Sequence, residues 1–350
     1  AERQFEAAQN QLNALLAARP DFADADQAYY ELGHSLLTAE NNAADAANAF
    51  RWITEHRPDS KLAAESWFRV AQYQSELAGQ ANLEQKNAAY ATAETAISKG
   101  LEKQPVGPLR ENMLYMLGDL QFRQQRFAAA AETLNEQVEE FKSGKYVGPA
   151  TFLAAQSYFQ LQQYEAALTL FARVSETAFP DTVDEQVRTY RTQAIYRAGD
   201  CAAKLNRWSE SQTYFQRLVD QFPQFSQLAE ARYGIAYALQ QQGQLDRAIE
   251  AYNQVTKSTE TETAAKARFM VGEIKFGQKL YEDAIEQFLT VTVGYPYDSW
   301  QGLARFEAAR CFVELGDKVN ARNLLRELIE KNPSHPRFAD AQKMLADLSQ

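Results

Sequence analysis

The chain has 350 residues, of which 46 are acidic and 36 are basic, so its formal net charge is −10. This balance, without any basic stripe, argues against nucleic acid as a partner, because phosphate recognition needs clustered lysine and arginine. Only 15 glycines and 10 prolines leave little room for the turns of an all-β fold, and no segment approaches the roughly 20 apolar residues of a membrane-spanning helix.

A first helical pattern, named B, recurs from one end of the chain to the other. It has an anchor, a small residue three later, a large apolar residue seven later and often a proline fifteen later, as in Trp208, Ser211, Phe215 and Pro223. These offsets place the side chains on one face of a helix, which the proline then ends. In chain order the anchors are Phe5, Ala43, Tyr90, Phe127, Tyr164, Trp208, Leu245, Tyr281 and Lys318.

A second helical pattern, named A, alternates with the first. Its mark is a glycine or alanine that stands nine residues before most of the anchors. We expect this small residue to let the A helix and the following B helix approach each other closely, because a larger side chain would hold the two apart. In chain order these small residues are Gly33, Ala71, Gly118, Ala155, Gly199, Ala236, Gly272, Ala309 and Ala346.

The two patterns together repeat every 36 or 37 residues and predict nine B helices and nine A helices in one array over residues 1–350. Extra residues near 74–86 indicate a lengthened A–B hairpin, and extra residues near 175–188 indicate an enlarged loop between repeats. The array begins on a B helix, a half-repeat, and ends on an A helix. We therefore expect the natural protein to continue upstream of Ala1, or another element to cap that end.

The order of small residue, aromatic anchor, alanine, aromatic residue and proline resembles the tetratricopeptide repeat family over essentially the whole chain. The resemblance implies an all-α solenoid, a right-handed superhelix of about nine helix–turn–helix repeats that binds partners on its concave side. The longer form of the repeat, as in "QFPQFSQLAEARYGIAYAL", is similar to bacterial envelope members such as the Tol-Pal-associated periplasmic protein and the outer-membrane-assembly lipoprotein. It implies a periplasmic or otherwise extracytoplasmic location, with the cytoplasm as the alternative.

An aromatic residue stands three positions before the small residue in eight of the A helices. The resemblance places this part of the helix towards the concave groove, so the rings are candidates for gripping a peptide or stacking on sugars. Regular aromatic stripes more often belong to the core, and packing between repeats is the interpretation that we favour. The row consists of Tyr30, Phe68, Tyr115, Phe152, Tyr196, Tyr233, Phe269 and Phe306.

The position one residue after the small residue varies between repeats, and such variation favours a role in partner choice. This second row consists of His34, Gln72, Asp119, Gln156, Asp200, Tyr237, Glu273 and Arg310. The predicted partner-binding residues are the aromatic row together with Asp119, Asp200, Tyr237, Glu273 and Arg310 of the second row, and Phe122, Phe159 and Phe276 four positions after the small residue.

No pattern in the sequence indicates catalysis, a cofactor or a metal. Cys201 and Cys311 lie three repeats apart, beyond the reach of a disulfide, and are predicted to be buried free thiols. The three histidines fall in different repeats and lack metal-ligand spacing. In "DFADAD" we expect Asp21 and Asp24 to cap an A helix rather than to bind calcium.

One stretch of the sequence contains aromatics that the repeat does not explain. In residues 293–312, Pro296 is predicted to end a B helix and Ser299 to cap the next A helix. Tyr297 and Trp300 occupy no repeat position, so anything specific in this stretch is expected there.

These patterns predict a non-catalytic scaffold that binds protein or peptide segments, in a bacterial cell envelope. The first alternative is a carbohydrate-related scaffold for polysaccharide export or wall assembly, in which exposed aromatics stack on sugars. The second alternative is the targeting arm of a larger enzyme. No cofactor, nucleic acid partner or membrane span is expected in this chain.

Overall fold

A computed structural model describes residues 2–19, 21–38, 42–80, 82–176 and 185–349, and divides the chain into two compact units, Ala1–Glu176 and Thr177–Gln350. Over these described ranges the regular structure is helical throughout, with eighteen α-helices and no strand. The prediction of an all-α fold built of about eighteen helices is therefore confirmed.

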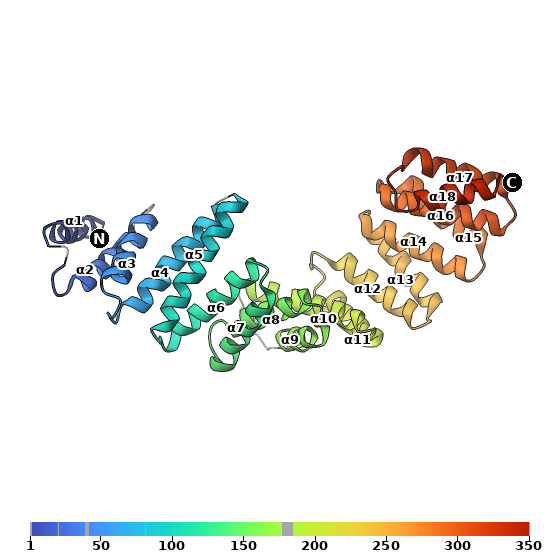
Figure 1. The fold of residues 1–350 in the computed structure, drawn as a ribbon. Helices are drawn as coiled ribbons and strands as arrows, with labels where there is room; N and C mark the ends of the chain where they lie inside the picture. Colours follow the sequence, from blue (N-terminus) through green and yellow to red (C-terminus); the bar gives the residue numbers. More distant parts are fainter. Residues whose placement is uncertain (1, 20, 39–41, 81, 177–184, 350) are drawn as a thin grey trace. The chain divides into compact units, whose positions relative to one another are not determined.

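The helices of the first unit follow one another in chain order (Figure 1). They are α1 (Glu2–Ala18), α2 (Ala25–Leu37), α3 (Ala43–His56), α4 (Ala63–Gln80), α5 (Leu83–Glu102), α6 (Gly107–Arg123), α7 (Phe127–Glu140), α8 (Val147–Gln160) and α9 (Tyr164–Glu176). Odd-numbered helices carry the B pattern and even-numbered helices the A pattern.

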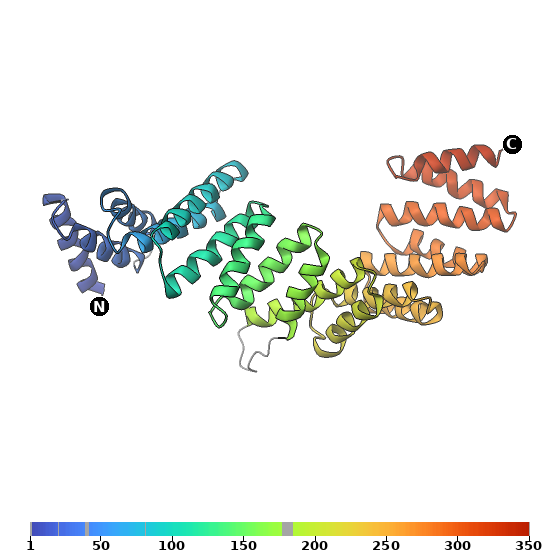
Figure 2. The same ribbon diagram turned by 60° about the horizontal axis from the view of Figure 1, so that its bottom comes forward.

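The same alternation continues through the second unit, whose last helices lie side by side in Figure 2. Its helices are α10 (Glu185–Lys204), α11 (Trp208–Gln221), α12 (Leu228–Gln241), α13 (Leu245–Ser258), α14 (Glu262–Gly277), α15 (Tyr281–Gly294), α16 (Asp298–Glu314), α17 (Lys318–Lys331) and α18 (Phe338–Asp347).

Within each unit a helix packs on the helices before and after it in the chain. The A helices also touch the A helices of the next repeat, as α4 touches α6 and α12 touches α14. They therefore form a layer in each unit, and residues at equivalent positions of successive A helices share one face of that layer. We call it the A-helix face.

The core of each repeat is the large B-helix residue seven after the anchor, packed on the small residue of the A helix. A Cβ atom added to Gly272 would lie 2.6 Å from Cε1 of Phe288, and one added to Gly199 would lie 2.8 Å from Cε1 of Phe215. The expected close approach at the small residue is thus confirmed. The large B-helix residues, each at most 3% exposed, are Phe50, Ile97, Leu134, Phe171, Phe215, Tyr252, Phe288 and Leu325.

Six of the turns from an A helix to a B helix share one backbone conformation. In the α6–α7 turn Gln125 has φ 61°, and Arg126 N–H donates to the carbonyl of Gln121 at 2.9 Å. This is the Schellman arrangement, which satisfies the last carbonyls of a helix and favours glycine at the residue with positive φ. The residues at that position are Gln125, Gln162, Asn206, Gly243, Lys279 and Gly316.

Two expectations about helix starts are wrong. Asp24 stands at the N-cap of α2 but its side chain accepts no capping hydrogen bond, and Asp21 instead pairs with the guanidinium of Arg57, the C-cap residue of the next B helix. Helix α16 begins at Asp298 with Tyr297 at its N-cap, so Ser299 lies inside the first turn. Before α2 the chain forms a turn in which Ala25 N–H donates to the carbonyl of Phe22 at 3.1 Å, whereas α16 follows an extended residue, Tyr297.

One predicted insertion lies within the first unit, and the residue range of the other spans the unit boundary. Residues 74–86 cover the end of α4 and the start of α5, which have 18 and 20 residues. The predicted loop near 175–188 lies largely on residues 177–184, outside the described residues, and so does Pro20. The side chains of Phe5 and Ala8 are likewise outside the described part of the structure.

The packing at the small residue makes a stability prediction for α14. Replacing Gly272 with alanine is expected to lower the free energy of unfolding by about 1–3 kcal/mol, because the new methyl group overlaps the buried ring of Phe288. Gly277→Ala is the matched control, since a Cβ there meets nothing within 4 Å and alanine favours a helix by up to about 1 kcal/mol. Urea unfolding followed by circular dichroism measures both, and a Gly272→Ala midpoint at or above that of the wild type would contradict this packing.

Candidate functional site on the A-helix face

The eight rings of the aromatic row differ in exposure according to residue type. The four phenylalanines, Phe68, Phe152, Phe269 and Phe306, are only 6–7% exposed. The four tyrosines, Tyr30, Tyr115, Tyr196 and Tyr233, are half-buried. Phenylalanine has no polar tip to keep in contact with water, whereas tyrosine buries its ring and leaves its hydroxyl at the surface. The phenylalanines therefore pack in the core, and partner binding by the tyrosines stays a prediction.

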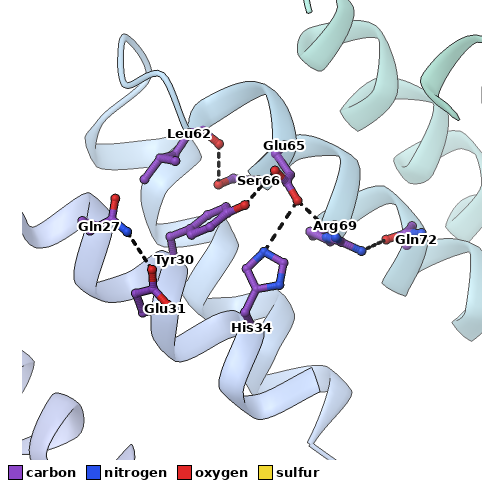
Figure 3. Close-up of polar contacts among 9 residues, drawn as sticks. All are labelled: Gln27, Tyr30, Glu31, His34, Leu62, Glu65, Ser66, Arg69 and Gln72. Atoms are coloured by element: carbon purple, nitrogen blue, oxygen red, sulfur yellow. Dashed lines mark hydrogen bonds and ion pairs between the residues drawn. The ribbon is translucent and has the colours of Figure 1, made fainter. Parts of the chain in front are cut away.

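In the first unit Tyr30 belongs to a polar network between α2 and α4 (Figure 3). Its hydroxyl donates to Oε2 of Glu65 at 2.7 Å, and Oε1 of Glu65 lies 3.1 Å from Nη2 of Arg69 and 3.6 Å from Nε2 of His34. Burial and the nearby carboxylate both raise the pKa of Tyr30, so its phenol stays protonated. The network uses the hydroxyl internally and ties one A helix to the next.

In the second unit four predicted residues line one pocket, namely Tyr196 and Asp200 of α10 and Tyr233 and Tyr237 of α12. The pocket has a volume of about 480 Å³, within the range of about 300–1,000 Å³ that is usual for ligand sites. Parts of α11 and α14 complete its lining. This pocket brings residues of both predicted rows together.

The charged groups around this pocket balance one another. Asp200 lies 3.2 Å from the guanidinium of Arg197, and burial raises its pKa while Arg197 opposes that rise. Across the pocket the ammonium of Lys266 stands 4.3 Å from the ring centre of Tyr233, a cation–π contact, and burial lowers the pKa of this lysine. Glu230 accepts a hydrogen bond from Thr263 at 3.1 Å.

The last predicted residues of the second row lie together at the α14–α16 contact. Arg310 pairs with Glu307 at 2.5 Å and stands over the ring of Phe276 at 4.6 Å from its centre. Glu273 faces the same group, and its pKa is raised first by burial and then by repulsion from Glu307. Its Oε1 is buried and accepts no hydrogen bond from the described residues.

The three phenylalanines placed four after the small residue contact the anchor of the following B helix. Ring centres are 5.3 Å apart for Phe122 and Phe127 and 5.5 Å apart for Phe276 and Tyr281, with edge-to-face geometry. Phe159 meets the anchor Tyr164 in the same way. These rings are half-buried, so they close the A–B hairpin while one edge stays accessible.

In the first unit Asp119 is also half-buried, and its Oδ2 accepts a hydrogen bond of 2.6 Å from Nε of Arg123 one turn later.

Trp300, which the repeat does not explain, packs its ring with the centre 5.5 Å from that of Phe269 and donates from Nε1 to Glu262 at 2.9 Å. It joins the A helices α14 and α16 and is therefore a contact between repeats.

The two cysteines are free and fully buried, as predicted. Burial raises the pKa of Cys201 and that of Cys311 to about 12 each. Within the described ranges no group of three or more histidine, cysteine, aspartate or glutamate residues is placed to hold a metal. None of the helices in that same part of the chain has the length and apolarity needed to cross a membrane.

The raised pKa values predict slow thiol chemistry. At pH 8 a thiol-specific disulfide reagent is expected to modify both cysteines at least about 100-fold more slowly in the folded protein than in concentrated urea, because the thiolate is the reactive species. Above pH 9 the unfolded chain ionises its thiols while the folded protein does not, so this contribution to stability falls as the pH rises from 9 towards 12. A thiol that reacts within seconds in the folded protein would contradict the burial.

Comparisons with known proteins agree with the repeat. A family model described as tetratricopeptide repeat matches residues 152–224, 196–262 and 233–299, and a second model with that description matches residues 303–335. A model described as anaphase-promoting complex, cyclosome, subunit 3 matches residues 86–174. No curated protein matches the sequence.

Several solved structures are similar at low identity. A tetratricopeptide repeat protein from Parabacteroides merdae is 14% identical, with 80% of this chain and 99% of that chain covered and a TM-score of 0.48. The C-terminal part of a repeat protein from Cytophaga hutchinsonii is 15% identical, with 89% and 98% covered and a TM-score of 0.46. YrrB, described as having an unusual peptide-binding site, is 18% identical, with 61% and 99% covered and a TM-score of 0.41.

The alternation of A and B helices, the contact between small and large residues in each repeat and the family matches all indicate the same kind of repeat. Because the two repeat models together match more than half of the sequence, this chain belongs to the tetratricopeptide repeat family.

Proposed function

We propose that this chain is a non-catalytic scaffold of a bacterial cell envelope that binds segments of partner proteins on the A-helix faces of its two units. Its family uses helix pairs of this kind as interaction surfaces. The observation that carries the proposal is the pocket between α10 and α12, lined by residues of both predicted rows. Aromatic walls combined with polar groups at fixed positions are typical of sites that hold a partner's side chain.

The envelope location rests on the length of the repeat, two or three residues more than is usual for the family. The similarity of this form to periplasmic members is a property of the sequence, and the location remains a proposal.

A carbohydrate partner is the second candidate. Trp208 and Tyr237 stand edge to face, with ring centres 5.7 Å apart, beside charged and hydroxyl groups of the same pocket. Aromatic faces next to hydrogen-bonding groups also suit a sugar ring, so binding of purified glycans without any protein partner would favour this reading.

Site-specific photo-crosslinking tests the scaffold proposal. A photoreactive amino acid at Tyr237 of α12 or Asp119 of α6 is expected to capture partner proteins in the source organism's envelope fraction, because both positions are on the A-helix face. Matched controls at Gln216 of α11 and Glu132 of α7, exposed positions of B helices, are expected to capture at least about five-fold less.

Equal yields from A-helix and B-helix positions would contradict the proposed face. Exclusively cytosolic partners would contradict the proposed location and leave the face supported.

A further inference from the structure

Four departures from the repeat meet in one place. The pocket between α10 and α12 is lined by Trp208, Ser211, Gly234 and Tyr237. In the sequence, the other eight B patterns carry alanine where Ser211 stands, and none of the other anchors is a tryptophan. None of the other second-row residues has the phenol that Tyr237 provides. Since the repeat residues build the scaffold, residues that break its rule at a single pocket indicate a specific site.

Gly234 lets an aromatic ring of α11 pack directly on α12. Two positions before the small residue, the other A helices from α2 to α16 carry larger side chains, namely Glu31, Arg69, Met116, Leu153, Arg197, Met270 and Glu307. A Cβ atom added to Gly234 would overlap the ring of Phe215, so that ring lies directly on the backbone of α12. The ring of Phe215 therefore occupies the place that a larger side chain takes in the other repeats.

Ser211 supplies an unused polar group. Its side chain is 1% exposed, and its Oγ has no hydrogen-bond partner among the described residues. A buried hydroxyl without a partner is unfavourable, whereas alanine at this position carries no such cost. Ser211 belongs to the residues that line the pocket, and its Oγ is the one buried side-chain polar atom of that lining without a partner among the described residues.

We infer that this pocket binds a tyrosine side chain of a partner segment, with the ring between the aromatic walls and the phenol hydrogen-bonded to Ser211. The inference rests on the proposed scaffold function and names the side chain that its pocket recognises. Phenol and serine hydroxyls each donate and accept, so they pair without a charge. Trp208 and Tyr237 offer an edge-to-face arrangement that a third ring can extend.

The rim of the pocket disfavours a charged occupant. Asp200 and Glu230 stand there with Lys204 and Lys266, so the fixed charges of the lining balance. Because two charges of each sign are present, a charged side chain would gain no net attraction there and would lose its hydration. An uncharged ring with a polar tip carries no such cost.

Titration of the intact chain with N-acetyl-tyrosinamide and N-acetyl-phenylalaninamide, followed by saturation-transfer NMR, tests the inference. The tyrosine amide is expected to bind about five-fold more tightly than the phenylalanine amide, the effect of one hydrogen bond. Ser211→Ala is expected to abolish this preference by weakening only the tyrosine amide. Because it restores the residue of the other repeats, it should leave the urea midpoint unchanged or higher.

Two further variants complete the design. Tyr237→Gln, which installs the residue found at Gln72 and Gln156, is expected to weaken both amides. Ser209→Ala removes an exposed serine from the same helix α11 and is expected to change neither amide's affinity. Maltotriose is titrated as the sugar probe.

Equal affinity for the two amides in the wild type, or an unchanged preference in Ser211→Ala, would overturn the inference, and so would maltotriose binding without amide binding. If these results came with efficient crosslinking at Tyr237, the scaffold proposal would stand and the tyrosine pocket would fail. The expected amide preference without any crosslinked partner would support the pocket and count against the scaffold.

Discussion

The close contact between the small residue of each A helix and the large residue of the next B helix is the constraint on which the rest of the structure depends. At Gly33, Gly199 and Gly272 the ring of the B helix lies against bare backbone, and no β-carbon would fit between them. This contact sets the spacing of the two helices, and that spacing decides which other side chains are covered. The Schellman turns keep the two helices of a pair in register, because six of them have the same backbone hydrogen bonds.

Once that spacing is set, it largely determines how deeply each ring of the aromatic row on the A-helix face is buried. Phe68 and Phe269 are buried in the core together with the large B-helix residues, whereas Tyr30 and Tyr233 are only half-buried. Specificity is therefore expected where a repeat departs from the common pattern. In the second unit such departures converge on α11 and α12, where Gly234 admits the ring of Phe215 against the backbone and Ser211 places a hydroxyl where the other repeats have alanine.

Much of the fold was predictable because it rests on short offsets within the sequence. The prolines follow the ends of B helices, as Pro58 follows α3 and Pro223 follows α11, and the small residues lie where the contacts require them. The helix starts were less predictable, since a capping residue competes with other partners: Asp21 pairs with Arg57, 36 residues away. The same limit applied to Trp300, whose indole N–H reaches Glu262, 38 residues earlier.

The candidate site was predictable only in part. Tyr196, Asp200, Tyr233 and Tyr237 could be selected by position, but Ser211 fits the small position of its B helix and Gly234 stands at a position that the repeat pattern does not mark. Both residues differ from those at the same position of the other repeats, and a position-by-position comparison of the repeats could have found them. Glu65 and Lys266, which cover Tyr30 and Tyr233 from the next repeat, gave no such signal.

The sequence by itself determined the helix order, the pairing of small with large residues and the two rows of the A-helix face, because these follow from periodicities shorter than one repeat. Only the tertiary structure decided which rings are buried, which hydroxyl lacks a partner and where a pocket opens. Those properties depend on side chains that lie about one repeat apart in the chain and meet only when neighbouring repeats stack.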